Sequence, residues 1–412
     1  MKYRNLYISY NGLLEEIVPS QVIPYLRELA KERYRFILLT FEKKQQLTRV
    51  GKKGITKLKN EVKDMGIEWY WLRYHKKMPL LATSFDVLLG AAVVLYLVIN
   101  KKVRVIHARS IVPAAMALVP ELFGVGFVFD TRGLLAEEYV GGGHWKEGGL
   151  KYRIVKFFEK FCLRHANSIV VLTERHREYL LGLPFFKNKD DGISIEVIPC
   201  CVDLDRFKYQ AAEVNFLRDK ENLRNSFVFT YLGKIGKHYM FKEMIAFFKN
   251  TMEVFPTSKL MIITQHNQQE LLKIILNNSM DSEKVIIRRP SFEEIPCLIS
   301  LANAGLFFIN PYKKFGSSPI KLGEFLSCGV PVIINSGIGD TEELVKTNKV
   351  GVVVDDFNDN SYKRALFEFV ELYKEGEVLR QRCRKAAEDL LSLEKGVKRY
   401  SSIYRQVLKC TA

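Results

Sequence analysis

The chain has 412 residues, of which 48% are hydrophobic and 26% are charged. This composition excludes a disordered or fibrous protein and predicts two or three globular domains. The 63 Lys and Arg outnumber the 46 Asp and Glu, and the net charge of +17 favours nucleic acid, an anionic membrane surface or phosphorylated small molecules as partners without choosing among them.

Strand-like apolar runs alternate with helical patterns along the whole chain. In the first half the runs are 6–10, 35–40, 67–71, 103–107, 126–130, 168–172 and 195–198. In the second half they are 227–232, 259–264, 285–288, 304–310, 330–335 and 351–354. This alternation is typical of parallel sheets with helices on both faces, so we predict an α/β fold of two doubly wound domains.

The domain boundary is expected where a strand stops at Pro199 and a polar turn follows. We predict an N-terminal domain over 1–204, a C-terminal domain over 205–390, and a last helix over 391–412 that packs back on the first domain. In such folds ligands bind beyond the carboxyl ends of the strands, so we expect the functional site in a cleft between the two domains.

Two further features concern the compartment. The seven cysteines are dispersed and the N-terminus lacks the apolar segment of a secretory signal, which predicts a cytoplasmic chain whose first residues belong to the fold. The apolar stretch 87–99 has 13 residues, whereas a membrane span needs about 20, so we expect a buried core helix there.

In the first domain, polar residues follow three of the strands. Gly12 lies in the loop after the first, His107 and Arg109 lie at the end of the run at 103–107, and the next run ends in Asp130. Each polar residue alone could be a loop-fixing hydrogen-bond partner, but together they are expected to line the cleft. We predict Gly12 and Arg109 on the acceptor side, and as candidate catalytic residues His107, Asp130, Arg132 and Glu138.

In the second domain, the loop after its first strand is a candidate phosphate site. Gly233 and Gly236 permit close approach of a ligand to the backbone, and Lys234 and Lys237 supply positive charge. The alternative interpretation is a solvated turn between a strand and a helix.

The segment 310–334 is the most informative. Ser318 suits a helix N-cap, Pro319 the first helical position and Gly329 the position after the helix. The helix N-terminus, Ser317, Ser318 and Lys321 would form an anion site for a diphosphate, and Glu324 would accept hydrogen bonds from a ribose. The alternative is an ordinary helix cap with an exposed ion pair.

Four ordered motifs resemble glycosyltransferase family 4. They are Ser318-Pro-Ile-Lys-Leu-Gly-Glu324 with its continuation to Ile333, the element 197–207, the strand 166–173, and 338–345 followed by 351–354. The resemblance implies a GT-B architecture of two Rossmann-like domains. It also implies metal-independent transfer of a hexose-type sugar, with retention, from a nucleoside diphosphate sugar to an acceptor hydroxyl, without a cofactor. The donor-binding residues would be Gly233, Lys234, Lys237, Gly316, Ser317, Ser318, Lys321 and Glu324.

The sequence departs from the family pattern at two places. Gly316 stands where the first Glu of the family's Glu pair is expected, and Asp130-Thr-Arg132-Gly replaces a stretch that often contains His. At both places the sequence is more similar to a subgroup of the family that builds polysaccharides. Alternatives left open are a catalytically weak partner subunit that binds nucleotide sugar, and a sugar-nucleotide epimerase or hydrolase on the same fold.

The partners expected are a nucleoside diphosphate sugar and a glycan or lipid-linked glycan acceptor, with no nucleic acid because the basic residues are dispersed. Basic clusters at 52–53, 73–77 and 101–104 predict peripheral contact with the anionic inner face of the cell membrane. Trp69 and Trp71 either join that contact or form the core face of a strand.

Overall fold

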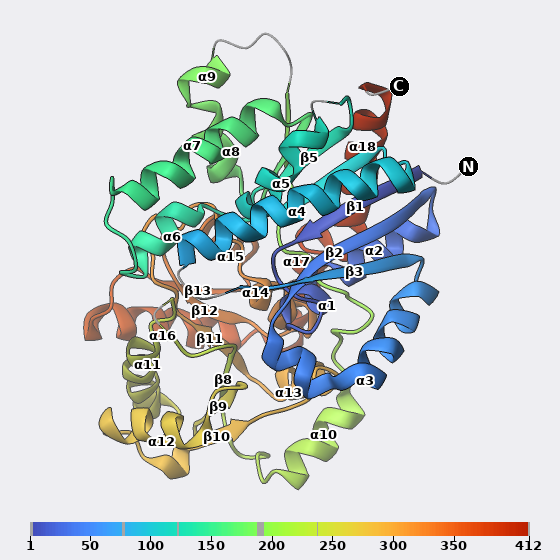
Figure 1. Cartoon of the computed structure of the whole chain (residues 1–412). Helices are drawn as coiled ribbons and strands as arrows, with labels where there is room; N and C mark the ends of the chain where they lie inside the picture. The colour runs from blue at the N-terminus through green and yellow to red at the C-terminus, as the bar shows by residue number, and fades with distance from the viewer. Residues whose placement is uncertain (1–2, 76–78, 122, 188–192, 237, 411–412) are drawn as a thin grey trace. The chain divides into compact units, whose positions relative to one another are not determined.

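A computed structural model describes residues 3–75, 79–121, 123–187, 193–236 and 238–410 (Figure 1). The chain divides into two compact units: unit 1 is Met1–Pro199 with Leu393–Ala412, and unit 2 is Cys200–Ser392. The division falls beside Pro199, a few residues before the predicted boundary at 204. Lys237 and the predicted contact residues 76–77 lie outside the described residues.

Unit 1 is built on a seven-stranded parallel sheet of order β3-β2-β1-β4-β5-β6-β7. Its strands are β1 (Tyr3–Ser9), β2 (Tyr34–Glu42), β3 (Ile67–Arg73), β4 (Val105–Arg109), β5 (Gly126–Asp130), β6 (Ser168–Val171) and β7 (Ser194–Val197). Its helices are α1 (Ile17–Gln21), α2 (Ile23–Lys31), α3 (Lys44–Asp64), α4 (Pro79–Lys101), α5 (Ile111–Glu121), α6 (Leu135–Gly141), α7 (Leu150–His165), α8 (Glu174–Leu181), α9 (Pro184–Lys187) and α18 (Leu393–Cys410).

Unit 2 repeats the theme with a six-stranded parallel sheet of order β10-β9-β8-β11-β12-β13. Its strands are β8 (Val228–Leu232), β9 (Lys259–Ile263), β10 (Val285–Arg288), β11 (Ala304–Phe307), β12 (Val332–Asn335) and β13 (Gly351–Val354). Its helices are α10 (Ala211–Lys220), α11 (Phe241–Val254), α12 (Gln268–Asn277), the 3-10 turn η1 (Ser282–Lys284), α13 (Ile295–Ser300), α14 (Ile320–Ser327), α15 (Thr341–Asn348), α16 (Asp359–Tyr373) and α17 (Glu377–Leu390).

In both sheets the chain reverses direction after its third strand and continues on the other side of its first strand, as in a doubly wound fold. In unit 1 the chain runs outward from β1 to β3, returns to β4 and continues to β7. Because crossovers between parallel strands are right-handed, α1 to α3 cover one face of the sheet, and α4, α5, α7 and α8 cover the other. The predicted fold class of two doubly wound parallel-sheet domains is therefore confirmed.

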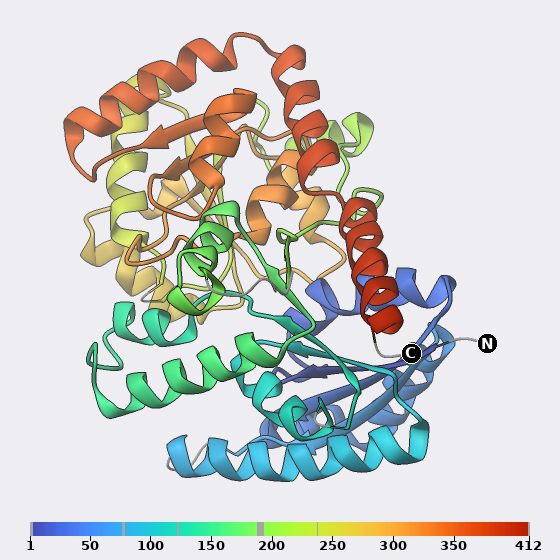
Figure 2. The same cartoon turned by 90° about the horizontal axis from the view of Figure 1, so that it is seen from above.

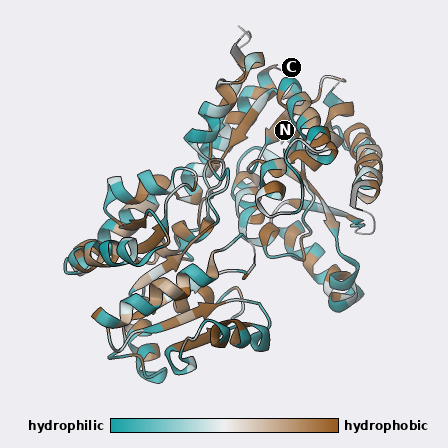
Figure 3. Ribbon diagram, turned by 90° about the vertical axis from the view of Figure 1, so that its left-hand side faces the viewer, coloured by the Kyte–Doolittle hydropathy of each residue, from teal (hydrophilic) through white to brown (hydrophobic). Residues whose placement is uncertain are grey.

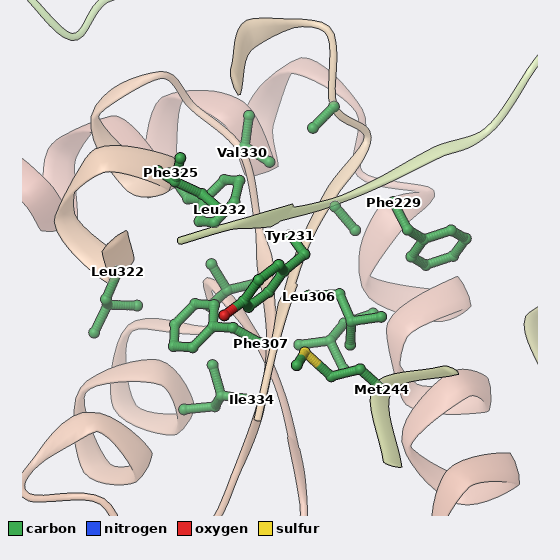
Figure 4. Packing of buried hydrophobic residues seen from close by; sticks show 14 of the residues in the cluster. Phe229, Tyr231, Leu232, Met244, Leu306, Phe307, Leu322, Phe325, Val330 and Ile334 are labelled. Atoms are coloured by element: carbon green, nitrogen blue, oxygen red, sulfur yellow. The ribbon is translucent and has the colours of Figure 1, made fainter. Parts of the chain in front are cut away.

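Helix α14 packs unusually closely on the sheet of unit 2. Figure 4 shows Leu322 and Phe325 of α14 among the buried side chains around Tyr231 and Phe307. The Phe307 and Phe325 rings stack 6.2 Å apart, and a Cβ on Gly305 would lie 2.7 Å from the Phe325 ring. Glycine at 305 thus allows the close approach that holds the site helix against β11.

Helix α18 belongs to unit 1 although it comes last in the sequence. The Tyr34 hydroxyl donates to the backbone oxygen of Ser401 at 3.1 Å, and the Ser401 hydroxyl donates to Glu32 at 2.6 Å. Tyr400 and Tyr404 are buried against the sheet on the face that α2 also covers. The helix therefore completes the hydrophobic core of the first unit.

The prediction of a buried core helix at 87–99 is wrong for one side of the helix. Helix α4 has 23 residues, and by length and composition Leu81–Lys101 could cross a membrane, with a mean hydropathy of 2.1. Only 33% of its most apolar stretch is buried. One side, with Val94 and Leu97, packs into the core, and the other carries exposed apolar side chains.

Candidate functional site

The site segment of unit 2 runs from β11 through a loop into α14. The helix begins at Ile320, so Pro319 is its N-cap residue and Ser318 lies outside it. The predicted cap at Ser318 is wrong, because the Ser318 hydroxyl instead accepts a hydrogen bond from the backbone N–H of Cys200 at 3.1 Å. Gly329 has a φ of 70° just after the helix, as predicted.

Lys321 is the most unusual charged residue of this unit. It is 5% exposed, and its Nζ has no hydrogen-bond partner among the described residues. The ammonium lies over aromatic rings instead, 4.0 Å from the centre of Tyr239 and 4.7 Å from that of Tyr231. Burial lowers the pKa of Lys321 to about 7. The expected exposed ion pair is therefore excluded, since this cation is buried without an acceptor.

Glu324 is the second buried charge of α14. It is 7% exposed, and burial raises its pKa to about 7, against the opposing effect of Lys321 and Arg206. Sequence reasoning missed Arg206, whose guanidinium stacks 3.5 Å above the Phe292 ring and donates to the Phe292 backbone oxygen at 2.5 Å. Two cations and one carboxylate are thus gathered in one apolar environment.

The loop after β8 covers Lys321. Gly233 has a φ of 134°, and a Cβ built there would lie 2.9 Å from the Lys321 Nζ. The Tyr231 hydroxyl donates to the backbone oxygen of Lys234 at 2.5 Å, which fixes the loop, while the Lys234 side chain is exposed. The structure therefore brings Gly233 and Lys321 together and leaves Lys234 at the surface. Gly316 is buried and Ser317 half-buried in the loop before α14.

The two glycines of this loop provide a matched test. Gly233→Ala places a methyl group against the Lys321 ammonium in a backbone conformation that favours glycine, whereas a Cβ at Gly236 meets nothing within 4 Å. We expect Gly233→Ala to weaken the binding of nucleoside diphosphates by about tenfold or more, which corresponds to about 1.4 kcal/mol in the free energy of binding. Gly236→Ala should leave the affinity unchanged. Calorimetry measures both. Equal affinities for the two variants would show that the loop does not position Lys321.

In unit 1 the predicted catalytic pair is buried. His107 is 1% exposed and Asp130 is 0% exposed. His107 Nδ1 lies 2.7 Å from the Tyr404 hydroxyl, and the Tyr400 hydroxyl donates to Asp130 at 3.2 Å. The His107 Nε2 lies 3.5 Å from Asp130. Both residues are therefore partners of α18 rather than exposed strand-end groups.

Charges next to this pair shift its ionisation. Burial lowers the pKa of His107, against the opposing effect of Asp130. Burial would raise the pKa of Asp130, but Arg132, His107 and Arg109 outweigh it and the pKa is lowered. At neutral pH the carboxylate is thus the counter-charge of a buried basic cluster.

Arg109 and Arg132 are brought together by a residue that sequence reasoning missed. The guanidinium groups of both donate to Gln21 Oε1 at 2.9 Å. Arg132 also lies 3.8 Å from Asp130 and has a φ of 53°, a left-handed conformation rare in residues other than glycine. Glu138, predicted as catalytic, is half-buried in α6, and its neighbour Glu137 is the buried partner of Lys156 at 3.1 Å.

The loop after β1 is held by a buried carboxylate. Glu42, at the end of β2, accepts from the backbone N–H of Leu13 at 2.5 Å, and a Cβ on Gly12 would lie 2.2 Å from its Oε2. Glycine is therefore required at position 12 for this close approach. At the same sheet edge, Asp86 accepts from the Tyr10 hydroxyl at 2.8 Å and lies 2.6 Å from His75 Nδ1, a dyad that no local motif indicates.

Comparison with known families accounts for most of the chain. Residues 213–389 match the family described as glycosyl transferases group 1, and residues 24–191 match a glycosyl transferase 4-like domain. The first match contains Gly233, Lys321 and Glu324, and the second contains His107 and Asp130. Among the curated proteins, no sequence matches the chain.

Solved structures share the fold over nearly the full length of both chains. Sucrose-phosphate synthase from Thermosynechococcus elongatus has a TM-score of 0.74 at 14% identity, covering 99% of this chain and 100% of that one. A glycosyltransferase from Rickettsia africae has a TM-score of 0.71 at 16% identity, covering 99% of both. HepE of Anabaena in complex with UDP-glucose has a TM-score of 0.70 at 13% identity, covering 98% of this chain and 99% of that one.

Proposed function

Because the chain belongs to the glycosyltransferases of the family 4 type, with the GT-B fold, we propose that it transfers a sugar from a nucleoside diphosphate sugar to an acceptor hydroxyl. We further propose that the sugar is a hexose, that the anomeric configuration is retained and that no metal ion takes part. The acceptor we propose is a growing polysaccharide or lipid-linked glycan.

One observation carries this proposal: the ammonium of Lys321 is buried beside a glycine loop, and no described residue accepts a hydrogen bond from it. A buried ammonium without a hydrogen-bond acceptor is costly in a protein alone, but it is favourable when an anion binds beside it. The free N–H groups at the start of α14 add positive potential at the same place. A diphosphate matches this arrangement in charge.

Lys321, Glu324 and the loop before α14 have separate roles in the proposed transfer. When the bond between the anomeric carbon and the diphosphate oxygen breaks, negative charge accumulates on the departing phosphate, and Lys321 would stabilise it. The carboxylate of Glu324 would accept hydrogen bonds from the ribose hydroxyls. Because Gly316 cannot supply a carboxylate, we propose that backbone N–H groups between Gly316 and Ser318 hold the sugar.

Two solved structures of the same fold support the proposed donor base and cellular setting. HepE of Anabaena, a protein of the same fold, is solved with UDP-glucose, and another, WaaG, is a glycosyltransferase involved in lipopolysaccharide biosynthesis. These relatives support a UDP-sugar donor and a cell-surface glycan acceptor for this chain. The cysteines are free thiols, which supports a cytoplasmic location.

The proposal is tested with a panel of donors. The full chain is titrated calorimetrically with UDP, GDP, ADP and their glucose derivatives, and hydrolysis and transfer are followed by NMR, which also reports the anomeric configuration. We expect one nucleotide to bind selectively and its sugar to be transferred with retention. Binding without turnover would favour a partner subunit, and an epimerised sugar nucleotide an epimerase. Absence of binding by folded protein would refute the donor site.

The pKa of Lys321 gives a prediction for pH. In the free protein this pKa is about 7, and a bound diphosphate raises it because the anion favours the ammonium. At pH 8 binding should therefore take up close to one proton, and affinity should fall by up to tenfold per pH unit above 7. Below pH 7 Glu324 becomes protonated and loses its role as a charged acceptor.

Proton uptake is measured by calorimetry at pH 8 in buffers of different ionisation enthalpy. Lys321→Met should abolish the uptake, whereas Lys234→Met, at an exposed position of the neighbouring loop, should retain it even where affinity falls. Uptake that persists in Lys321→Met would assign the proton to another group.

A further inference from the structure

Helix α4 presents an uninterrupted apolar face to solvent. The side chains of Leu81, Phe85, Leu88, Tyr96 and Ile99 are all more than half exposed, and they recur at intervals of three, four or eight residues. This spacing places them on one side of the helix. In Figure 3, which looks nearly along the axis of α4, the ribbon of this helix is mostly brown, the colour of hydrophobic residues. An apolar face of this length is unusual on a protein in water.

Helix α7 has a second apolar stripe, and here the stripe has basic borders. Leu150, Ile154, Phe157 and Phe161 are exposed at intervals of four, three and four residues. At 100° per residue, Lys151 falls on one side of this stripe, and on the other side fall three further exposed cations, Arg153, Lys160 and Arg164. An apolar stripe between rows of Lys and Arg is typical of helices that lie in a membrane interface.

The described acidic groups of these helices are buried or paired with other groups. The one acid within α7, Glu159, is only 12% exposed at its side chain and pairs with Lys156. At the end of α5, Glu121 pairs with His165 at 3.3 Å, and Asp86 of α4 is fully buried. The exposed charge along the apolar stripe of α7 is therefore positive, which complements an anionic surface.

The two stripes belong to one layer of unit 1. Helix α5 packs against both α4 and α7, and all three contribute to the core on the same face of the seven-stranded sheet. Figures 1 and 2 agree in placing α4 and α7 on one side of this sheet and α18 on the other. Phe123, 73% exposed just after α5, adds to the same layer. We call the outer side of α4 and α7 the α4–α7 face.

We propose that the α4–α7 face binds the surface of an anionic lipid bilayer. The apolar side chains enter the boundary between headgroups and acyl chains, and Lys151, Arg153 and Lys160 contact the anionic headgroups. Helix α4 does not cross the bilayer, because β3 and β4 at its two ends are strands of one sheet. This proposal rests on the surface alone and does not depend on the proposed function.

The α4–α7 face differs from the membrane contact predicted from sequence. Trp69 is 2% exposed and its indole N–H donates to Thr40 at 2.9 Å, so it is a core residue of β3. Lys101 is engaged by Glu68 at 2.7 Å. The predicted aromatic and basic cluster is thus partly used inside the fold, and α7, which sequence reasoning passed over, supplies the exposed cations.

The test is flotation of the full chain with vesicles of phosphatidylcholine and phosphatidylglycerol in equal parts, against vesicles of phosphatidylcholine alone. We expect binding to the anionic vesicles that decreases with salt. Leu88→Asp/Phe157→Asp should lower the partition coefficient by about a hundredfold or more, since two large side chains no longer enter the bilayer. Lys151→Glu/Arg153→Glu should lower it about tenfold on anionic vesicles only.

The matched control is Phe216→Asp/Leu276→Asp in unit 2, because Phe216 is 65% exposed and Phe157 is 66% exposed. It should bind vesicles like the unmodified chain, and circular dichroism should show all variants folded. Equal vesicle binding by the two Asp variants would refute the proposal. The proposal would also be refuted if the unmodified chain bound no vesicles and formed a dimer that only Leu88→Asp/Phe157→Asp converts to a monomer. The α4–α7 face would then be a protein interface.

Discussion

Replacing Lys321 by Met should weaken donor binding strongly while making the protein more stable. The substitution keeps the length and apolar character of the side chain and removes a buried cation for which the described part of the chain offers no hydrogen-bond acceptor. Loss of one charged group that stabilises the departing diphosphate should reduce turnover by about 100- to 1,000-fold. Few other single substitutions should separate activity from stability so clearly.

The expected gain in stability follows from the sign of the pKa shift. The pKa of Lys321 is lowered from its usual value to about 7, so between these two values the unfolded chain binds more protons than the folded protein. The folded state is therefore disfavoured as the pH falls toward 7, by an amount on the order of a few kcal/mol. Lys321→Met removes this cost, and the melting temperature at pH 7 should rise by several degrees.

Thermal unfolding and nucleotide titration of the same preparations check both halves of this prediction. Lys242→Met, at an exposed position of α11, is the control and should change neither quantity. Glu324→Gln should lower affinity by about tenfold, because an amide oxygen is a weaker acceptor than a carboxylate. If Lys321→Met unfolded more easily and still bound the nucleotide, Lys321 would be a structural residue.

The sequence predicted the sheets well because their signal is local. Each buried strand is a short apolar run, and right-handed crossovers leave few ways to join such runs. The extent of α4 was missed because Thr83, Ser84 and Asp86 interrupt its apolar run. Asp86 is tolerated there since Tyr10 and His75, from the ends of two strands, satisfy it. That pairing is a tertiary contact, which periodicity does not report.

The sequence predicted which residues form the candidate site on α14, but not that they are buried or which side chains surround them. The spacing of Lys321 and Glu324 placed them on one helix face, yet their burial depends on Tyr231 and Phe307 of the sheet and on Tyr239 of the loop. The helix cap was misplaced because the Ser318 hydroxyl serves Cys200, far away in the sequence. Contacts of this range have no signature in a single sequence.

The same limit explains why the burial of His107 and Asp130 was not predicted. Polar residues at the ends of parallel strands usually face a ligand. The sequence near residue 130 does not indicate that a helix from the end of the chain covers His107 and Asp130. Tyr400 and Tyr404 of α18 bond to Asp130 and His107. We therefore expect Asp130 to act mainly on the stability of unit 1.

Asp130→Ala should destabilise unit 1 by about 3 to 5 kcal/mol, the usual result of removing one partner of a buried charge cluster. The pKa of Asp130 is lowered in the folded state, so its contribution is complete above the unfolded value of 3.8 and is lost as the pH falls through the native pKa. At pH 7 the whole effect should be present, as a fall of about 10 °C in melting temperature.

Hydrogen exchange locates this effect, because the backbone amides of α18 should lose protection first once Tyr400 has no acceptor. Asp130→Asn keeps an oxygen for Tyr400 but loses the charge opposite Arg132. Its melting temperature should therefore lie between those of the unmodified chain and Asp130→Ala. Glu138→Ala, half-buried in α6, should change the melting temperature little. If Asp130→Asn instead lost sugar transfer at an unchanged melting temperature, Asp130 would lie at the substrate. Only the chemistry, and not the attachment of α18, would then depend on its charge.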